Sequence, residues 1–421
     1  MKLTELLLSN RKLSFLMIIV LTFLQFACAS PKHEKEQSVY NHRMGELTIK
    51  AKPGATVIIE QVSHEFWFGC AIPNSLADGS MQETDKKQFE EKFLQNFNSA
   101  VTENAVKWAT MERQKGQPNY SVIDGILAWT EANQIPLRGH NLFWGIEKFI
   151  QPWVKELSDE ELELTIKNRA ENVAARYKGR FVEYDLNNEM VHGNYYEDRL
   201  GADITKRMAE WSQNGDPEIK LWLNDYDILT GKKLPEYMAQ IRLLLGQGVP
   251  IAGIGVQGHL HAETFDREQL KNALDSIAQF NLPIRVTEFN MPGQRSKYYD
   301  DRNLKLTDEE EVQKANELVD YYKICFAHPA VEGILMWGFW EGANWIPVSS
   351  LYKRDWSPTP SAEAYRKLIF NEWWTKEEGK VNRKGELSVP AFFGKYKVTV
   401  DGVTKEIDLT KTAGSVEVIF N

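Results

Sequence analysis

Short apolar segments alternate with longer amphipathic segments along most of this 421-residue chain. Eight of the apolar segments have the length and the β-branched or aromatic content of buried strands. Strands that alternate with helices indicate a parallel sheet, and eight of them favour a closed barrel over an open, doubly wound sheet. The predicted strands are Phe66–Ile72, Phe97–Thr102, Leu137–Phe143, Phe181–Asn188, Lys220–Tyr226, Ile254–His259, Ile284–Phe289 and Ile334–Phe339.

Segments with helical spacing connect these strands. No Gly-x-Gly-x-x-Gly follows the first strand and no phosphate-binding lysine loop is present, so the signatures of nucleotide-binding sheets are missing. We therefore predict an α/β fold, a (β/α)8 TIM barrel, over residues 66–375. The predicted helices include Thr84–Asn96, Val122–Asn133, Asp159–Tyr177, Lys233–Gln247, Arg267–Phe280, Glu309–Ala327 and Ala362–Trp374.

Two segments with alternating polar and apolar residues flank the predicted barrel. Residues 44–65 contain a Pro53-Gly54 turn and predict a short N-terminal β-hairpin that packs on the barrel. Residues 376–421 contain short alternating segments separated by turns such as Asp401-Gly402, and predict a small C-terminal β-module. We expect this module to close the barrel structurally, in preference to forming a separate sugar-binding unit.

The N-terminal residues 1–29 read as a signal peptide. A basic start precedes an apolar run, Leu13–Phe26, which is shorter than a comfortable membrane span. An Ala-Cys-Ala sequence around Cys28 fits either ordinary signal cleavage or lipidation of Cys28, and we favour lipidation, although Gln25 stands where lipoprotein sites usually have Leu. Residues 30–43 predict a flexible polar tether. The protein is thus expected to be exported, either as an outer-membrane or cell-surface lipoprotein or as a periplasmic or secreted protein.

Charge and cysteine content exclude several classes of function. The net charge is −9 and no basic run is present, which argues against a nucleic-acid partner. Beyond the signal, only Cys70 and Cys325 remain, and we expect both to be buried free thiols. His259 and His261 form a His-x-His pair without a third ligand nearby, so we expect no metal and no cofactor. We also expect a monomer.

One predicted strand ends in an unusual way. The segment Phe181–Met190 reads FVEYDLNNEM, an apolar strand that ends on Asn-Asn-Glu. Carboxylates are rarely buried without a partner, whereas a barrel strand that delivers a carboxylate to an active site would end in this way, because barrel active sites lie at the carboxyl ends of the strands. Alternatively, Glu189 simply begins a loop or caps a helix.

The other strand ends carry polar and aromatic residues as well. Each has a simple structural explanation; Lys107, for example, could be a solvated charge and His140 a core histidine. Because the carboxyl ends of barrel strands converge, however, we expect these residues to share one pocket. They are Asn104 and Lys107; His140 and Trp144; Asn224, Asp225 and Tyr226; Gln257 and His259; Glu288 and Asn290; Trp337, Trp340 and Trp345.

Glu288 supplies a second carboxylate for Glu189. Two carboxyl groups on facing strands can hydrolyse a glycosidic bond, one as the nucleophile and the other as the acid and then the base. A separation of about 5–5.5 Å would give retention of anomeric configuration, and about 6.5–9.5 Å would give inversion. The sequence leaves this distance open.

The order and spacing of the motifs resemble those of family 10 of the glycoside hydrolases, the endo-β-1,4-xylanase family of retaining (β/α)8 enzymes. The resemblance extends from about Phe66 to Leu368. The motifs that carry it are TENAVKW (102–108), RGHNLFW (138–144), YDLNNE (184–189), LNDYD (223–227), GVQGHL (255–260), VTEFN (286–290) and MWGFWEGANW (336–345).

The resemblance implies a role for each matching residue, with xylan or a xylo-oligosaccharide as the substrate. Glu189 would be the acid/base and Glu288 the nucleophile. Asn188 would bind the 2-hydroxyl of the sugar before the cut, Gln257 would contact that sugar, and His259 would bond to the nucleophile. Sugars on the non-reducing side would contact Asn104, Lys107 and His140, and the subsites would be lined by Trp144, Trp337 and Trp345.

Four positions depart from the family pattern. Asn290 replaces an aspartate two residues after the nucleophile, and the lost charge would shift the working pH. Tyr184 replaces a tryptophan, Gly145 a histidine, and Glu341 or Gly342 an aspartate. These changes leave two alternatives, a β-1,4-glucanase with the same barrel and a non-catalytic, surface-anchored glycan-binding lipoprotein.

Overall fold

A computed structural model describes residues 39–259 and 262–421. The predicted signal peptide with Cys28, most of the predicted tether and His261 lie outside the described residues. The segment Arg43–Asn421 forms one compact unit. No helix in the described part of the chain combines the length and the apolar character needed to cross a membrane.

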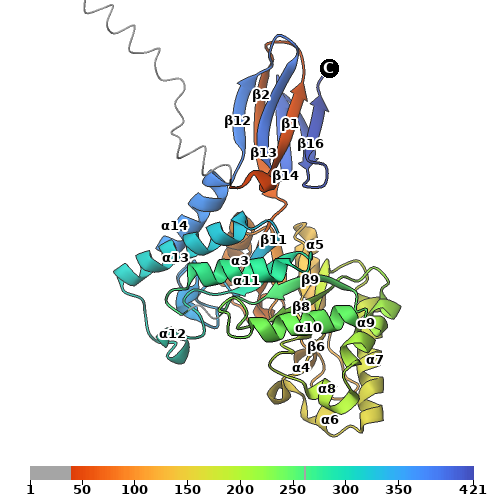
Figure 1. Ribbon diagram of the computed structural model, residues 1–421. Helices are drawn as coiled ribbons and strands as arrows, with labels where there is room; N and C mark the ends of the chain where they lie inside the picture. The colour runs from red at the N-terminus through yellow and green to blue at the C-terminus, as the bar shows by residue number, and fades with distance from the viewer. Residues whose placement is uncertain (1–38, 260–261) are drawn as a thin grey trace, which may run out of the picture. The chain divides into compact units, whose positions relative to one another are not determined.

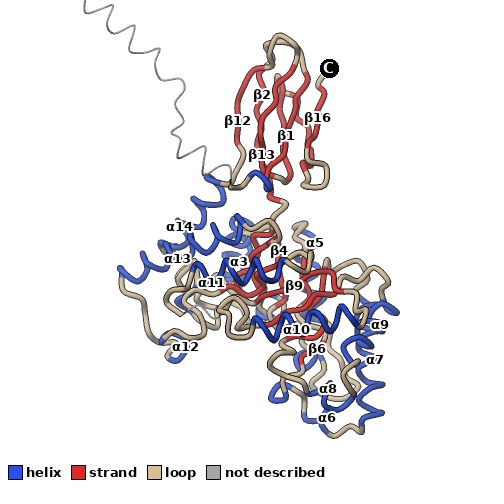
Figure 2. Tube along the Cα trace, viewed as in Figure 1, coloured by secondary structure: helices blue, strands red, loops and turns tan. Residues whose placement is uncertain are grey.

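Eight parallel strands close into a barrel, so the predicted (β/α)8 TIM barrel is confirmed (Figures 1 and 2). The last strand pairs with the first, with Leu335 opposite Gly69 and Met336 opposite Cys70. The strands are β3 (Trp67–Ile72), β4 (Ser99–Thr102), β5 (Leu137–Gly139), β7 (Glu183–Asn188), β8 (Leu221–Asp225), β9 (Ile251–Val256), β10 (Ile284–Phe289) and β11 (Val331–Met336). The two-residue strand β6 (Phe143–Trp144) extends the sheet beside the end of β7.

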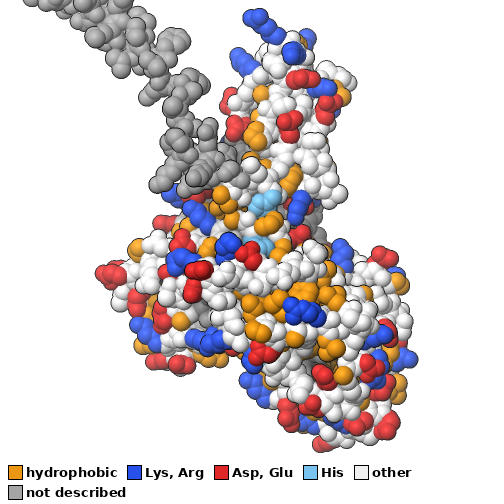
Figure 3. All heavy atoms as spheres, in the orientation of Figure 1, with side chains coloured by type: hydrophobic (Ala, Val, Ile, Leu, Met, Phe, Trp, Pro, Cys, Tyr) orange, Lys and Arg blue, Asp and Glu red, His pale blue; other side chains and the backbone are white. Residues whose placement is uncertain are grey.

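Helices follow the strands and bury their apolar sides against the barrel. Two of the long ones begin with a capping box, Ser158 with Glu161 and Thr307 with Glu310, which satisfies backbone N–H groups that the first helical turn leaves free. The main helices are α3 (Glu83–Asn96), α5 (Ser121–Ala132), α7 (Asp159–Arg176), α9 (Ile204–Gly215), α10 (Leu234–Gly246), α11 (Arg267–Ala278), α13 (Asp308–Ala327) and α14 (Pro360–Lys367). On the face drawn in Figure 3, basic and acidic side chains are interspersed.

The structure corrects the pairing expected for residues 44–65. The two strands exist, but they lie in different sheets of a β-sandwich that both ends of the described chain build together. One sheet has the order β13 (Glu386–Phe392), β1 (Met44–Lys50), β16 (Ser415–Ile419); the other has β12 (Lys376–Lys380), β2 (Thr56–His64), β14 (Gly394–Val400), β15 (Val403–Leu409). This arrangement gives the two strands one shared core, which includes the buried Leu47, Ile49, Val57 and Ile59.

Hydrogen bonds connect the first strand of the sandwich to the barrel. Buried Arg43, just before β1, donates to the carbonyl oxygens of Phe326, His328 and Val331 at 2.6–2.9 Å. The aromatic side chains of residues 376–421 are all buried, so none of them offers an open face to a sugar; they are Phe392, Phe393, Tyr396 and Phe420. Cys70 and Cys325 are buried free thiols, as predicted.

Candidate active site

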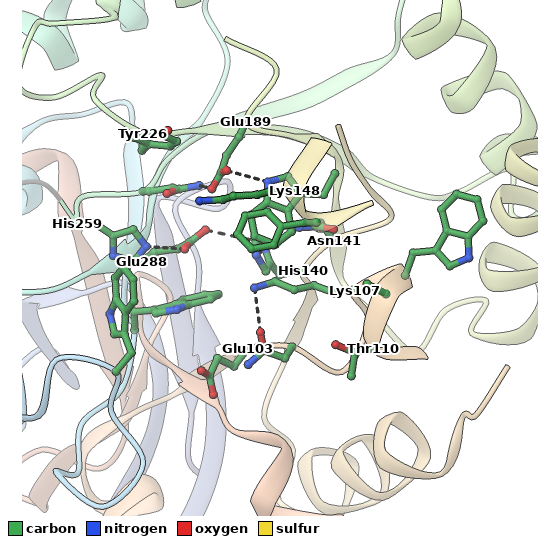
Figure 4. Close-up of a pocket in the computed structure, with 18 of the residues that line it drawn as sticks. Glu103, Lys107, Thr110, His140, Asn141, Lys148, Glu189, Tyr226, His259 and Glu288 are labelled. Carbon is green, nitrogen blue, oxygen red and sulfur yellow. Dashed lines mark hydrogen bonds and ion pairs between the residues drawn. The ribbon is translucent and has the colours of Figure 1, made fainter. Parts of the chain in front are cut away.

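A cavity of about 570 Å³ opens at the carboxyl ends of the barrel strands (Figure 4). It brings together most of the residues singled out from the strand ends. The predicted residues that line it are Asn104, Lys107, His140, Trp144, Glu189, Gln257, His259, Glu288, Trp337 and Trp345. Tyr226 lines it as well. The other residues singled out, Asn188, Asn224, Asp225, Asn290 and Trp340, do not line the cavity.

Glu288, at the end of β10, is buried and surrounded by hydrogen-bond donors. Its Oε1 accepts from Asn224 Nδ2 at 2.8 Å, and its Oε2 lies 2.7 Å from His259 Nε2. Burial alone would raise the pKa of Glu288, but His140, His259 and Lys107 together lower this pKa to about 2. Glu288 is therefore a carboxylate at any pH at which the protein is expected to work.

Glu189 follows the last residue of β7, and its backbone has a left-handed φ of 59°. Trp144 Nε1 donates to Oε2 at 2.7 Å, and Gln257 Nε2 donates to Oε1 at 2.9 Å. Burial raises the pKa of Glu189, and the negative charges of Glu288 and Asp225 add to this effect, while the bonds from Gln257 and Trp144 oppose it. Glu189 thus retains its proton to a higher pH than an ordinary glutamate.

Two carboxyl groups in one cavity therefore differ in protonation. The difference arises because Glu288 has positive neighbours, whereas Glu189 has neutral donors and negative neighbours. An anion and an acid facing the same space can act as a nucleophile and a proton donor in one reaction. Within the described residues, no group of three or more His, Cys, Asp and Glu side chains is arranged to hold a metal ion.

A chain of hydrogen bonds extends from Glu288 away from the cavity. His259 Nδ1 lies 3.0 Å from Asn290 Oδ1, and the same oxygen accepts from Trp345 Nε1 at 2.8 Å. An indole N–H can only donate, so the Asn290 atom at this position must be oxygen, and His259 must donate from Nδ1. Asn290 Nδ2 in turn donates to Ser349 Oγ at 2.9 Å. Asn290 thus orients His259, which contacts Glu288, and the Asn290 amide is uncharged.

Asn224 connects Asn188 with the carboxyl group of Glu288. Asn224 Nδ2 donates to Asn188 Oδ1 at 3.1 Å as well as to Glu288, and Asn224 Oδ1 accepts from Thr287 Oγ1 at 2.6 Å. Asn188 Nδ2 is buried and has no hydrogen-bond partner among the described residues. It is therefore a free donor next to the cavity, in keeping with the sugar contact that the family resemblance implies.

Lys107 lies in the interior of the cavity. Its Nζ donates to Asn104 Oδ1 at 3.0 Å, and it lies 4.8 Å from the ring of Trp144 and 5.7 Å from that of Trp337. Burial lowers its pKa, and nearby carboxylates, including Glu103, oppose this. Glu103 lies at the end of the same predicted strand, Phe97–Thr102, and inside the same motif; the sequence assigned it no role, and it lines the cavity.

Trp144 and Tyr226, which line the cavity, each stack on an aromatic ring that the sequence did not reveal. Phe149 stacks on Trp144, with ring centroids 3.9 Å apart and an interplanar angle of 22°. His192 stacks on Tyr226 with centroids 3.6 Å apart, and His192 Nδ1 lies 2.8 Å from Asp225 Oδ1. No motif marks Phe149, in the short 3-10 helix Glu147–Phe149, or His192, because their contacts depend on how segments outside the barrel strands fold.

Comparison with known proteins identifies the family. A family model described as Glycosyl hydrolase family 10 matches residues 58–368, a range that contains all eight barrel strands. The chain belongs to glycosyl hydrolase family 10. The family resemblance seen in the motifs is therefore confirmed.

Curated relatives of this family 10 chain match it over most of its length. It is 33% identical to anti-sigma-I factor RsgI6 of Acetivibrio thermocellus over 352 residues. The matched region covers 83% of this chain and 43% of that protein. It is also 33% identical over 365 residues to endo-1,4-beta-xylanase 1 of Arabidopsis thaliana, covering 86% of this chain and 36% of the relative. The chain thus spans less than half the length of these relatives.

Solved structures share the family 10 fold. Xylanase 10B from Thermotoga petrophila, in complex with xylobiose, superposes with a TM-score of 0.66 at 23% identity and covers 73% of this chain and 95% of its own. Xylanase 10C from Cellvibrio japonicus, a mutant in complex with xylopentaose, gives 0.64 at 17% identity, with coverage of 73% and 67%.

Proposed function

We propose that this protein is a retaining endo-β-1,4-xylanase. The observation that carries the proposal is the unequal protonation of two glutamates in one cavity: Glu288 is held as an anion, with its pKa near 2, and the pKa of Glu189 is raised. Family membership supports glycoside hydrolysis, and several curated relatives are named endo-1,4-beta-xylanases.

In the first step, Glu288 Oε1 or Oε2 attacks the anomeric carbon, and Glu189 donates its proton to the leaving glycosidic oxygen. The bond to the leaving sugar breaks as the bond to Glu288 forms, which leaves a covalent glycosyl ester. In the second step, Glu189, now ionised, removes a proton from water, and the resulting hydroxide displaces Glu288. Trp144 and Gln257 keep the Glu189 carboxyl in place through both steps, because they bind both of its oxygens.

Substrate choice is tested by assaying xylan, mixed-linkage β-glucan and carboxymethylcellulose side by side. We expect xylan to be cleaved fastest, with internal cuts that lower viscosity early. Faster cleavage of β-glucan would favour the glucanase alternative. The anomeric configuration of the first product, followed by NMR, tests retention.

The role of Glu288 is tested by Glu288→Ala. We expect activity to fall by about 10⁴-fold or more, because the variant has no nucleophile. Circular dichroism and the thermal midpoint would check that the variant folds. A wild-type protein that binds xylan without cleaving it would instead support the glycan-binding alternative.

We also propose that the protein is exported and anchored through lipidated Cys28, on the basis of the apolar run and the Ala-Cys-Ala sequence. Labelling with a radioactive fatty acid should mark the wild type but not Cys28→Ala. A wild type that takes up no label and appears in the medium would favour soluble secretion.

A further inference from the structure

Four side chains form a stack beside Glu189 at the mouth of the cavity. Lys107 Nζ lies 4.8 Å from the ring of Trp144, Phe149 stacks on that ring at 3.9 Å, and Lys148 Nζ lies 4.7 Å from the ring of Phe149. All four line the cavity. Figure 4 labels Lys107, Lys148 and Glu189 around this cavity, and Trp144 of the stack donates to Glu189 Oε2 at 2.7 Å.

The two lysines of the stack differ in the charges around them. Lys107 is hydrogen-bonded to Asn104 and is surrounded by the carboxylates of the cavity. Lys148 is exposed, and in the described part of the chain it forms no ion pair, only the contact with Phe149. The adjacent acid, Glu147, points its carboxylate toward Lys155 instead, 3.8 Å away. Lys148 is therefore a cation at the cavity mouth without a counter-charge from the protein.

Phe149 gives this cation a defined position. An ammonium group is attracted to the face of an aromatic ring, and the ring of Phe149 is itself fixed because it stacks on Trp144. Trp144 is held in turn by its bond to Glu189. The charge of Lys148 is thus positioned relative to the cleaved bond. An acidic polymer is repelled by a chain with a net charge of −9, so one positive group at the mouth would favour its correct placement.

We propose that Lys148 binds a carboxylate on a side group of the polysaccharide, so that the enzyme prefers xylan with uronic acid branches near the cleavage site. The proposal rests on the proposed function, since it concerns which substrates of that reaction are favoured. An ammonium group recognises a carboxylate through charge-assisted hydrogen bonds, and a neutral branch of the same size offers no such partner. Phe149 acts as a positioning residue, because it sets the place of Lys148.

The experiment compares kcat/KM for three xylo-oligosaccharides of equal length: one unbranched, one with a single uronic acid branch and one with a neutral arabinose branch. For wild type we expect the acidic substrate to be preferred over the arabinose-branched one. Lys148→Gln should lower kcat/KM about fivefold for the acidic substrate alone, the size of one exposed ion pair, and the loss should appear in KM. Lys148→Glu should lower it further, Lys148→Arg should retain the preference, and the difference between wild type and Lys148→Gln should shrink at high salt.

Lys155→Gln is the matched control, because Lys155 is an exposed lysine on the same segment that is already paired with Glu147. It should leave all three rates unchanged. An equal loss of activity on all three substrates in Lys148→Gln would overturn the inference and assign the lysine a structural role, as would a wild type without preference for the acidic branch. A wild type inactive on all three substrates would instead contradict the proposed function, so the two failures can be told apart.

Discussion

Two clusters of buried charge lie inside the same barrel, and they differ in how their charges are balanced. Near the amino-terminal ends of the strands, Arg138 bonds to both Glu183 and Asp185, and Arg285 Nε lies 2.9 Å from Glu183. Two arginines face two carboxylates there. Burial alone would raise the pKa of Glu183, but Arg285 and Arg138 lower it, so each carboxylate of this cluster is paired with an arginine.

At the carboxyl-terminal ends, the balance is uneven. Glu288 has cationic neighbours that lower its pKa, whereas Glu189, in the same cavity, has a raised pKa. Burial of charge therefore does not by itself indicate a reaction centre in this protein. What distinguishes the cavity is that its two carboxyl groups, Glu189 and Glu288, have neighbours of different charge. The clusters are also connected, because Asp185, which binds Arg138, lies 2.8 Å from His140 Nδ1, and His140 lowers the pKa of Glu288.

The largest test of this contrast is Glu189→Ala. Without a proton donor, hydrolysis of xylan should fall by about 10²–10⁴-fold, while the first step on an aryl xylobioside with a good leaving group should be nearly unchanged. Pre-steady-state release of the aryl group would measure this difference. Glu103→Ala removes another carboxyl group from the same cavity and should affect both substrates alike. Equal losses in Glu189→Ala would contradict the acid role.

Arg138→Met tests the opposite cluster. It leaves two buried carboxylates short of a partner, so the free energy of unfolding should fall by about 3–5 kcal/mol, measured by urea denaturation. Arg180→Met is the control, since it removes an exposed pair with Glu131 and should cost under about 1 kcal/mol. Equal losses of stability in the two variants would contradict a structural role for the Arg138 cluster.

The smallest expected effect is that of Trp144→Phe on the pH profile. The indole N–H stabilises the ionised form of Glu189, so its removal should raise the pKa of Glu189 further. Because Glu189 must be protonated to act as the acid, the alkaline limb of kcat should move to higher pH by about half a unit to one unit. Trp153→Phe, whose N–H bonds to the Glu112 carbonyl instead, should leave that limb in place. A shift in the other direction would contradict the assignment.

The sequence predicted the barrel and most of the cavity, because periodicity and strand ends depend on short-range patterns. Strand bounds were less accurate where glycine interrupts the apolar run. The strand β9 was expected at Ile254–His259, but it begins at Ile251 and includes Gly253, where a Cβ atom would lie 2.4 Å from the ring of Trp222. The need for glycine at position 253 comes from Trp222 on the neighbouring strand β8, so the local sequence pattern does not predict it.

Other features depend on contacts between distant parts of the chain. The expected hairpin at 44–65 failed because each of its strands pairs with partners more than 300 residues away. Phe149 was missed for a related reason, since its role depends on a loop that folds back onto Trp144. The effect of Asn290 on the working pH stays a prediction; the structure adds that the amide oxygen, fixed by Trp345, is the atom that His259 meets.

The left-handed backbone of Glu189 has a consequence for how this barrel tolerates change. A residue with a side chain costs about 1–2 kcal/mol more than glycine in that conformation, and here it also buries a carboxyl group. Glycine at this position would relieve that strain, but Trp144 and Gln257 would then lose the acceptor of their N–H groups. Selection for heat resistance and selection for turnover therefore act on different properties of Glu189, the proposed proton donor.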